Sequence, residues 1–244
     1  MVFQRSAMMM AVAVLLAACQ PAAYPGSSPA LQPLPVDAAL MPGGQLTAEQ
    51  AARNFVAVVA RVEPVAEAMC RERNPRSNCD FQIVVDDRPD QPPNAFQTLD
   101  RAGRPIIGFT LALIADARNV DEIAFVVGHE AAHHVAGHIP QVQRTATTGA
   151  VLAGVLAQAS GAPPEAVRAA QQMGATMGAR TYARNFELEA DALGAEIAFR
   201  AGFDPLRGAA FFDRLPDPGD QFLGSHPPNA QRKEIVRQVV AGLQ

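Results

Sequence analysis

The stretch GHEAAHHVAGH, residues 128–138, contains four of the five histidines in the 244-residue chain. His129 and His133 are four residues apart, so on a helix they project from one face, about one turn apart. Two imidazoles in this arrangement can reach one divalent ion, and the neighbouring Glu130 can accept a proton from a metal-bound water. Because zinc accepts imidazole nitrogens and keeps a position open for water, the pattern predicts a catalytic zinc ion, one per chain.

Two neighbouring histidines fall outside this pair. His134 points about 100° away from His133 around the helix, and His138 lies five residues beyond His133, off the face that carries the pair. We therefore expect neither side chain to bind the ion. A surface helix that carries two histidines by accident is the alternative explanation of the motif, although the apolar residues on this helix argue for a buried site.

The residues around the motif predict a helix with one buried face. Asn119 can cap its N-terminus, with Glu122 at the capping-box position, and apolar residues recur at helical spacing over 120–131. Pro140 is expected to end the helix. Residues 145–160 are apolar and rich in small side chains, but glycines interrupt them. We therefore predict a packed helix or a flexible lid there, and not a membrane span.

The rest of the chain predicts a mainly helical α+β domain, with a small sheet of three or four strands beside the motif helix. A helix from Thr47 to about Arg73 comes first, and Pro64 is expected to kink it or to begin a second segment. Three strands follow, the last two as a hairpin: DFQIVVDD (80–87), NAFQTL (94–99) and RPIIGFTLAL (104–113). Beyond Leu111 we predict only helices, which begin near residues 119, 163, 185, 204 and 229.

The N-terminus resembles that of an exported bacterial lipoprotein. Arg5 precedes an apolar run over 8–17 that is too short to span a membrane comfortably. The sequence Leu-Ala-Ala-Cys that ends at Cys19 resembles a lipobox, whose cysteine is acylated, and Gln20 resembles the signal for the outer membrane. An ordinary signal peptide with an incidental Cys19 is the alternative.

The chain is therefore expected to divide into three parts: a lipoprotein signal peptide (1–18), a lipid-anchored flexible linker rich in Pro, Ala, Gly and Ser (19–45), and one folded domain (46–244). The composition fits a folded globular domain, with 49% hydrophobic and 18% charged residues. The net charge of −4 gives no argument for a nucleic-acid partner.

Two further cysteines remain if Cys19 carries lipid. Cys70 and Cys79 then form an even pair, and the periplasm is an oxidising compartment, so a disulfide is expected between them. The ring that it closes is short, which limits the stabilisation to about 2–3 kcal/mol in the loop-entropy model. Two buried free thiols are the alternative.

A catalytic zinc ion usually takes three protein ligands, so a third must come from elsewhere in the chain. FELEADALG, residues 186–194, offers Glu187, Glu189 and Asp191. Glu187 and Asp191 share one helical face, whereas Glu189 points elsewhere. Since the flanking residues are apolar, a carboxylate on this helix is costly unless it is paired or metal-bound. A solvated acidic face is the alternative.

HEAAHH followed by FELEAD resembles the HtpX-like zinc metalloendopeptidases, the gluzincin family that includes the CAAX prenyl proteases. The resemblance covers roughly residues 46–240 and is closest to the small periplasmic lipoprotein members of the BepA and LoiP type. It implies a zincin-like metallopeptidase domain. It also implies that Glu187 is the third ligand and that Asp191 orients the first histidine from behind.

Two more segments share the resemblance. Asn94-Ala95-Phe96 is similar to the family segment at the start of the sheet, which implies a role in substrate binding. SHPPNAQR contains the family pattern H-P-x-x-x-x-R, which implies that His226 is a removable fourth zinc ligand and that Arg232 stabilises the oxyanion. A histidine that flanks a helix and an arginine on a solvated face are the alternatives.

These features predict a zinc-dependent endopeptidase, lipid-anchored on the periplasmic side of the bacterial outer membrane. Family members hold substrate as an extended strand along a sheet edge, and PIIGFTL (105–111) is our candidate edge. Such binding favours unfolded chains, so we expect unfolded or misfolded envelope polypeptides as substrates. The alternatives are a zinc-binding, chaperone-like lipoprotein that His226 latches shut, and a structural protein with an accidental motif.

Overall fold

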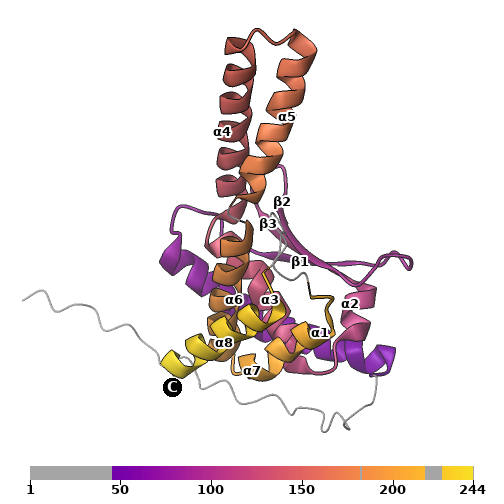
Figure 1. The fold of residues 1–244 in the computed structure, drawn as a ribbon. Helices are drawn as coiled ribbons and strands as arrows, with labels where there is room; N and C mark the ends of the chain where they lie inside the picture. The colour runs from indigo at the N-terminus through magenta and orange to yellow at the C-terminus, as the bar shows by residue number, and fades with distance from the viewer. Residues whose placement is uncertain (1–45, 182, 218–226, 244) are drawn as a thin grey trace, which may run out of the picture. The chain divides into compact units, whose positions relative to one another are not determined.

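The computed structural model describes residues 46–181, 183–217 and 227–243 (Figure 1). The predicted signal peptide, linker and lipidated Cys19 lie outside these residues, as does His226. Eight α-helices, one 3-10 helix and three strands follow in the order α1 (Ala48–Arg73), β1 (Gln82–Asp86), β2 (Ala95–Leu99), β3 (Pro105–Thr110), α2 (Leu111–Asp116), α3 (Val120–Val135), α4 (His138–Ala159), α5 (Pro164–Arg180), α6 (Ala183–Arg200), α7 (Pro205–Gly208), η1 (Ala209–Arg214) and α8 (Asn229–Leu243), counted over the described residues. The predicted mainly helical α+β class is confirmed.

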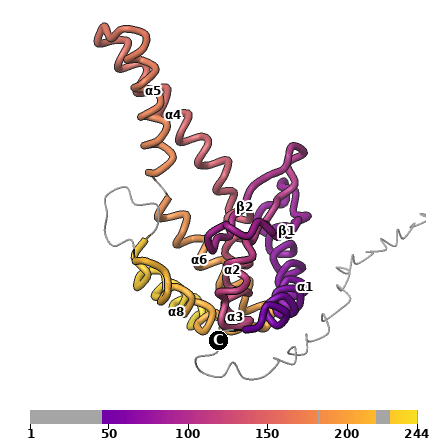
Figure 2. Tube along the Cα trace, turned by 90° about the vertical axis from the view of Figure 1, so that its right-hand side faces the viewer, coloured from indigo at the N-terminus to yellow at the C-terminus, as the bar shows by residue number. Residues whose placement is uncertain are grey.

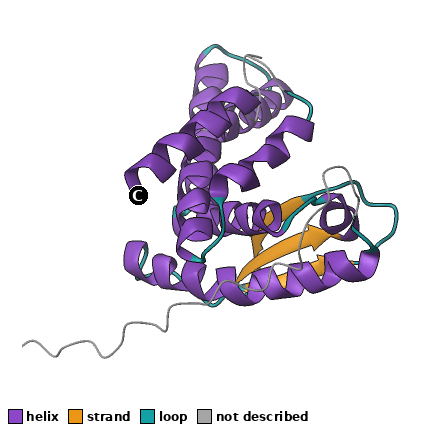
Figure 3. Cartoon of the chain, turned by 90° about the horizontal axis from the view of Figure 1, so that it is seen from below, coloured by secondary structure: helices purple, strands orange, loops and turns teal. Residues whose placement is uncertain are grey.

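The sheet has the strand order β1-β3-β2, with β1 parallel and β2 antiparallel to β3 (Figure 3). The prediction that residues 105–111 form the open edge is therefore wrong, because β3 is the central strand. The physical reason is the burial of β3: its consecutive residues Ile107, Gly108 and Phe109 are all buried, as in a strand covered on both faces. The open edges belong to β1 and β2.

Helices pack against this sheet and against one another to form a single core. Phe55 of α1 meets Phe109 of β3 edge-on, with ring centroids 5.1 Å apart. Helix α3 contacts both α1 and α6, and α6 in turn contacts α8. Most residues of α3, the helix that carries the H-E-x-x-H motif, are therefore buried, and His129 is among them.

Helix starts follow the predicted capping in part. The Thr47 hydroxyl accepts from Gln50 N at 3.2 Å at the start of α1, and Asn119 Oδ1 accepts from Glu122 N at 2.9 Å at the start of α3. Helix α1 continues as one element through Pro64, so no second segment begins there.

One predicted boundary is wrong. Pro140 does not end the motif helix: α3 ends at Val135, Gly137 adopts a left-handed φ of +68°, and Pro140 lies in the first turn of α4, where a missing N–H costs nothing. Helix α8 begins at Asn229, where its start is predicted. Nδ2 of Asn229 donates to the carbonyls of Phe212 and Leu215.

Helices α4 and α5 form a hairpin that extends away from the sheet (Figures 1 and 2). The two helices touch through their backbones: a Cβ on Gly149 would lie 2.1 Å from the Gly174 carbonyl oxygen. The region over 145–160 is therefore a packed helix, the first of the two options that its sequence left open. A search of the described residues finds no helix with the length and apolar character needed to cross a membrane.

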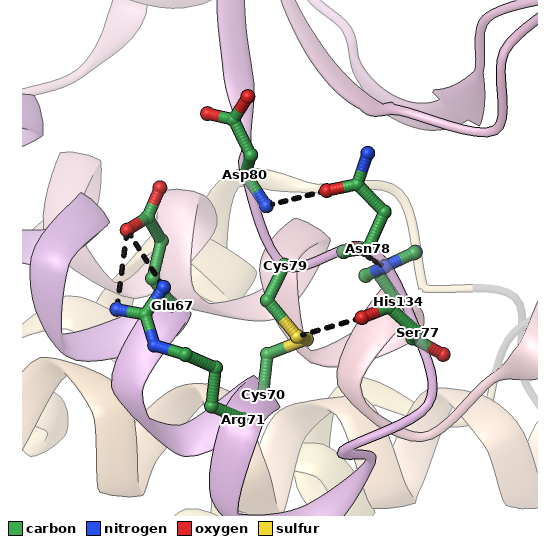
Figure 4. The surroundings of a disulfide bond; sticks show 8 residues. All are labelled: Glu67, Cys70, Arg71, Ser77, Asn78, Cys79, Asp80 and His134. Carbon is green, nitrogen blue, oxygen red and sulfur yellow. Dashed lines mark hydrogen bonds and ion pairs between the residues drawn. A yellow bond between two sulfur atoms is a disulfide. The ribbon is translucent and has the colours of Figure 1, made fainter.

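A disulfide joins Cys70, near the end of α1, to Cys79, ahead of β1 (Figure 4). The carbonyl of Asn78, next to Cys79, lies 2.7 Å from Nε2 of His134 on α3. The ring of His134 also meets Phe81 edge-on. The disulfide loop is thereby joined to the helix that carries the motif, and His134 has a structural contact that explains why it points away from His133.

Candidate active site

Three side chains predicted as metal ligands converge in the structure. Nε2 of His129 and Nε2 of His133 lie 3.1 Å apart on α3. The carboxylate of Glu187 on α6 lies 3.6 Å from the first of these atoms and 3.5 Å from the second. Among the described residues, these three form the cluster of histidine, cysteine and acidic side chains that could hold a metal ion. Glu189 is more than half exposed and stands apart from it.

The chemistry of this donor set fits a cation. Nδ1 of His129 lies 3.0 Å from Asp191 Oδ1, so its proton belongs on Nδ1 and its lone pair on Nε2. If His133 likewise keeps Nε2 unprotonated, two lone pairs meet at 3.1 Å beside a carboxylate. They cannot hydrogen-bond to one another, so a shared cation resolves their repulsion.

The surroundings shift the pKa values of the two imidazoles in opposite directions. Burial, with the charge of His129, lowers the pKa of His133 to about 3, so its imidazole stays neutral as a metal ligand must. Burial also lowers the pKa of His129, but Asp191 and Glu187 outweigh it and leave the pKa raised. Burial acts to raise the pKa of Asp191, yet contacts with His129 and Arg232 reverse this and keep the carboxylate charged.

Helices α3 and α6 approach closely enough to join the ligands because glycine faces glycine at their crossing. A Cβ on Gly194 would lie 2.7 Å from the backbone nitrogen of His129, and a Cβ on Gly128 would lie 2.7 Å from the Gly194 carbonyl oxygen. No larger residue fits either position without moving a helix backbone. Gly128 immediately precedes the motif, so the sequence does carry a signal for this close approach.

Arg232 of α8 lies behind Asp191. Its Nε and Nη2 each donate to the Asp191 carboxylate at 2.7 Å, and its guanidinium lies 4.0 Å from the centroid of the Phe212 ring. The alternative of an arginine on a solvated face is wrong, because Arg232 is only 6% exposed. The structure places this side chain in a chain of contacts that runs through Asp191 to His129. Stabilisation of an oxyanion by Arg232 stays a prediction.

Two cavities meet at the cluster. The first cavity has a volume of about 540 Å³, and Val142 and Phe186 are among its lining residues. The second has a volume of about 500 Å³, and Phe211 and Arg232 are among its lining residues. Both are lined by the same four residues: Ala95, His129, Glu130 and Glu187. Glu130, the predicted general base, therefore lies where the two cavities join.

Strand β2 presents its open edge to these cavities. Thr110 N donates to Asn94 O and Asp100 N donates to Arg104 O, so the even-numbered residues of β2 bond to β3. Because the pattern alternates in an antiparallel pair, the N–H and C=O groups of Ala95 and Gln97 face away from β3. Both residues line the larger cavity.

The predicted triplet Asn94-Ala95-Phe96 divides in the structure. Ala95 lines both cavities and Asn94 lines the smaller one. Phe96 instead lies with its ring over Gly108, where an added Cβ would be 2.2 Å from the ring, and it lines neither of these two cavities. Gln97, the other edge residue, cannot be recognised from the sequence, because a lone glutamine in a strand carries no chemical signal.

Comparisons with known proteins agree with this geometry. A model of peptidase family M48 matches residues 57–240. A Vibrio cholerae protein named "Putative beta-barrel assembly-enhancing protease" is 36% identical over 123 residues, 48% of this chain and 25% of its own length. The mitochondrial metalloendopeptidase OMA1 of Arabidopsis thaliana is 30% identical over 137 residues, 54% of this chain and 27% of its own length. The chain thus matches about a quarter of each relative.

Proposed function

Because the chain belongs to peptidase family M48, we propose that it is a metal-dependent peptidase, and more specifically a zinc endopeptidase that hydrolyses peptide bonds in unfolded or misassembled envelope proteins. The observation that carries the proposal is the convergence of His129, His133 and Glu187 on one point. Two imidazoles and one carboxylate are a ligand set of catalytic zinc, and three protein ligands leave a position for water.

The chain's own residues supply the proton transfers. Bound zinc would polarise the scissile carbonyl and acidify the attacking water. Glu130 follows His129 on α3 and lines both cavities, so its carboxylate can accept the proton of that water and deliver it to the leaving amine. Asp191 holds the ring of His129, and Arg232 holds Asp191.

The open edge of β2 supports binding of an extended polypeptide. The N–H and C=O groups of Ala95 and Gln97, which face away from β3, can pair with the main chain of a substrate, as in addition of a strand to a sheet. Glu130 lines both cavities, which otherwise differ in most of their lining residues, so they can take substrate side chains from the two sides of the scissile bond. Main-chain pairing selects little for sequence and favours substrates that are unfolded.

The activity test uses the purified domain with zinc and casein as an unfolded substrate. We expect cleavage, loss of cleavage with a chelator, and recovery when zinc is restored. Glu130→Gln should bind zinc as the wild type does and lose activity by at least about 100-fold, the contribution expected of a general base. Full hydrolysis by Glu130→Gln would exclude the mechanism, and the absence of stoichiometric zinc in the wild type would exclude the metal.

We also propose that a lipid on Cys19 anchors the domain to the periplasmic side of the outer membrane. The lipobox-like sequence at residues 16–19 supports this location. Labelling with radioactive palmitate in a bacterial host should mark the full chain and leave Cys19→Ser unlabelled. Equal labelling of both chains, or of neither, would contradict the anchor.

A further inference from the structure

His138 is buried beside the metal-ligand cluster without belonging to it. It is 3% exposed and is the first residue of α4. Its ring stacks on Phe186, with centroids 4.4 Å apart and planes 22° from parallel. Its Nδ1 lies 2.8 Å from Nδ1 of His133, and its Nε2 lies 3.2 Å from Glu189 Oε2. Each nitrogen of this ring thus faces a specific partner.

One arrangement of protons satisfies all these contacts at once. When Nε2 of His133 directs its lone pair to the cluster, the proton of the neutral ring is on Nδ1. That N–H can donate only to an unprotonated Nδ1 on His138. The proton of His138 is then on Nε2, where it donates to the carboxylate of Glu189. No other pair of neutral tautomers leaves the ligand nitrogen of His133 free and both contacts bonded.

We propose that His138 is a positioning residue that fixes the tautomer and ring orientation of His133, with Glu189 as the terminal acceptor. The inference rests on the proposed zinc site. Each histidine ligand would then have one orienting partner: Asp191 of α6 contacts His129, and His138 of α4 contacts His133.

The turn after α3 makes this contact possible. On a continuous helix, a residue five positions beyond His133 would lie off the face of the ligands. Here α3 ends at Val135 and Gly137 turns the chain with a φ of +68°. Helix α4 therefore starts in a new direction and returns His138 to His133, which is why helical spacing alone assigned it no place near the site.

The test compares variants by zinc affinity, measured by competition with a chromogenic chelator. His138→Phe keeps the stacking on Phe186 but removes the acceptor, and we expect zinc affinity to fall by about 10- to 100-fold. His138→Gln offers a carbonyl oxygen to His133 and should recover part of the loss. His134→Phe is the matched control, because His134 contacts Asn78 and no ligand, and its zinc affinity should equal that of the wild type.

A measurement on the wild type makes the test independent of any variant that fails to fold. In the zinc-loaded protein with ¹⁵N-labelled histidine, NMR should show His133 protonated at Nδ1 and His138 protonated at Nε2. A proton on Nδ1 of His138, or unchanged zinc affinity in folded His138→Phe, would overturn the proposal. Zinc binding with these tautomers but no hydrolysis would instead reject only the proposed activity.

Discussion

Asp191 is a fully buried carboxylate that lies between two cationic or polar partners. It contacts Nδ1 of His129 at 3.0 Å and accepts two hydrogen bonds from Arg232 at 2.7 Å. A buried charge is tolerated only when such partners compensate for lost hydration. The same residue therefore contacts a proposed metal ligand and neutralises a buried arginine, so the effects of these two contacts should be separable by measurement.

Asp191→Ala should lower both stability and zinc affinity. Because the buried Arg232 would lose both hydrogen bonds to Asp191 and keep a 3.5 Å ion pair with Glu187, the free energy of unfolding of the metal-free protein should fall by about 3–5 kcal/mol, measured by urea denaturation. Zinc affinity should fall by about 10- to 100-fold, since His129 loses its orienting contact. The control is Glu234→Ala, which removes an exposed pair with Arg237 and should change little. Equal effects of both substitutions would contradict the assigned role.

At the scale of secondary-structure elements, the site depends on the crossing of α3 and α6. Gly194→Ala would place a methyl group 2.7 Å from the His129 backbone nitrogen, so the helices must separate. We expect a loss of about 1–3 kcal/mol in the free energy of unfolding and weaker zinc binding. Gly242→Ala, where a Cβ meets nothing within 4 Å, is the control and should be neutral or slightly stabilising. Unchanged zinc affinity in Gly194→Ala would show that the crossing does not set the site.

The edge of β2 gives a second test at this scale. The N–H of Gln97 faces the open edge, so Gln97→Pro should fold but bind substrate strands more weakly, which raises KM while kcat changes less. Thr98→Pro removes an N–H that faces β3 and should destabilise the sheet. Measuring thermal stability and casein cleavage for both variants separates the two roles. A KM of Gln97→Pro equal to that of the wild type would reject β2 as the docking strand.

On the scale of the whole molecule, a metal ion would join elements that are distant in the sequence. His133 on α3 and Glu187 on α6 are separated by the α4–α5 hairpin, yet their ligand atoms lie 3.5 Å apart. A metal ion that binds only the folded state would therefore stabilise the core.

Removal of zinc should lower the melting temperature of the domain. At a free zinc concentration about 1,000 times the Kd, linkage predicts a stabilisation of about 4 kcal/mol relative to the metal-free protein. Calorimetry with and without a chelator measures this difference. Glu187→Gln should reduce the response to zinc, because a neutral amide is a weaker ligand. An identical melting temperature for holo and metal-free wild type would contradict a site that spans α3 and α6.

The sequence by itself determined the parts of this protein that depend on local spacing. His129, Glu130 and His133 needed only the period of a helix, and Glu187 and Asp191 needed only a helical spacing of four together with the family resemblance. The helical class, the small sheet and the caps at the starts of α1 and α3 also followed from short patterns, because capping and periodicity act within a few residues.

Only the tertiary structure decided which distant segments meet. Three features depend on contacts between separate elements. They are the central position of β3, the close approach of the Gly128 and Gly194 backbones, and the contact between His138 and His133. Arg232 was placed behind Asp191 by the packing of α8 on α6. Helical and strand periods carry no information on how elements turn or cross, since those choices are made by packing in three dimensions.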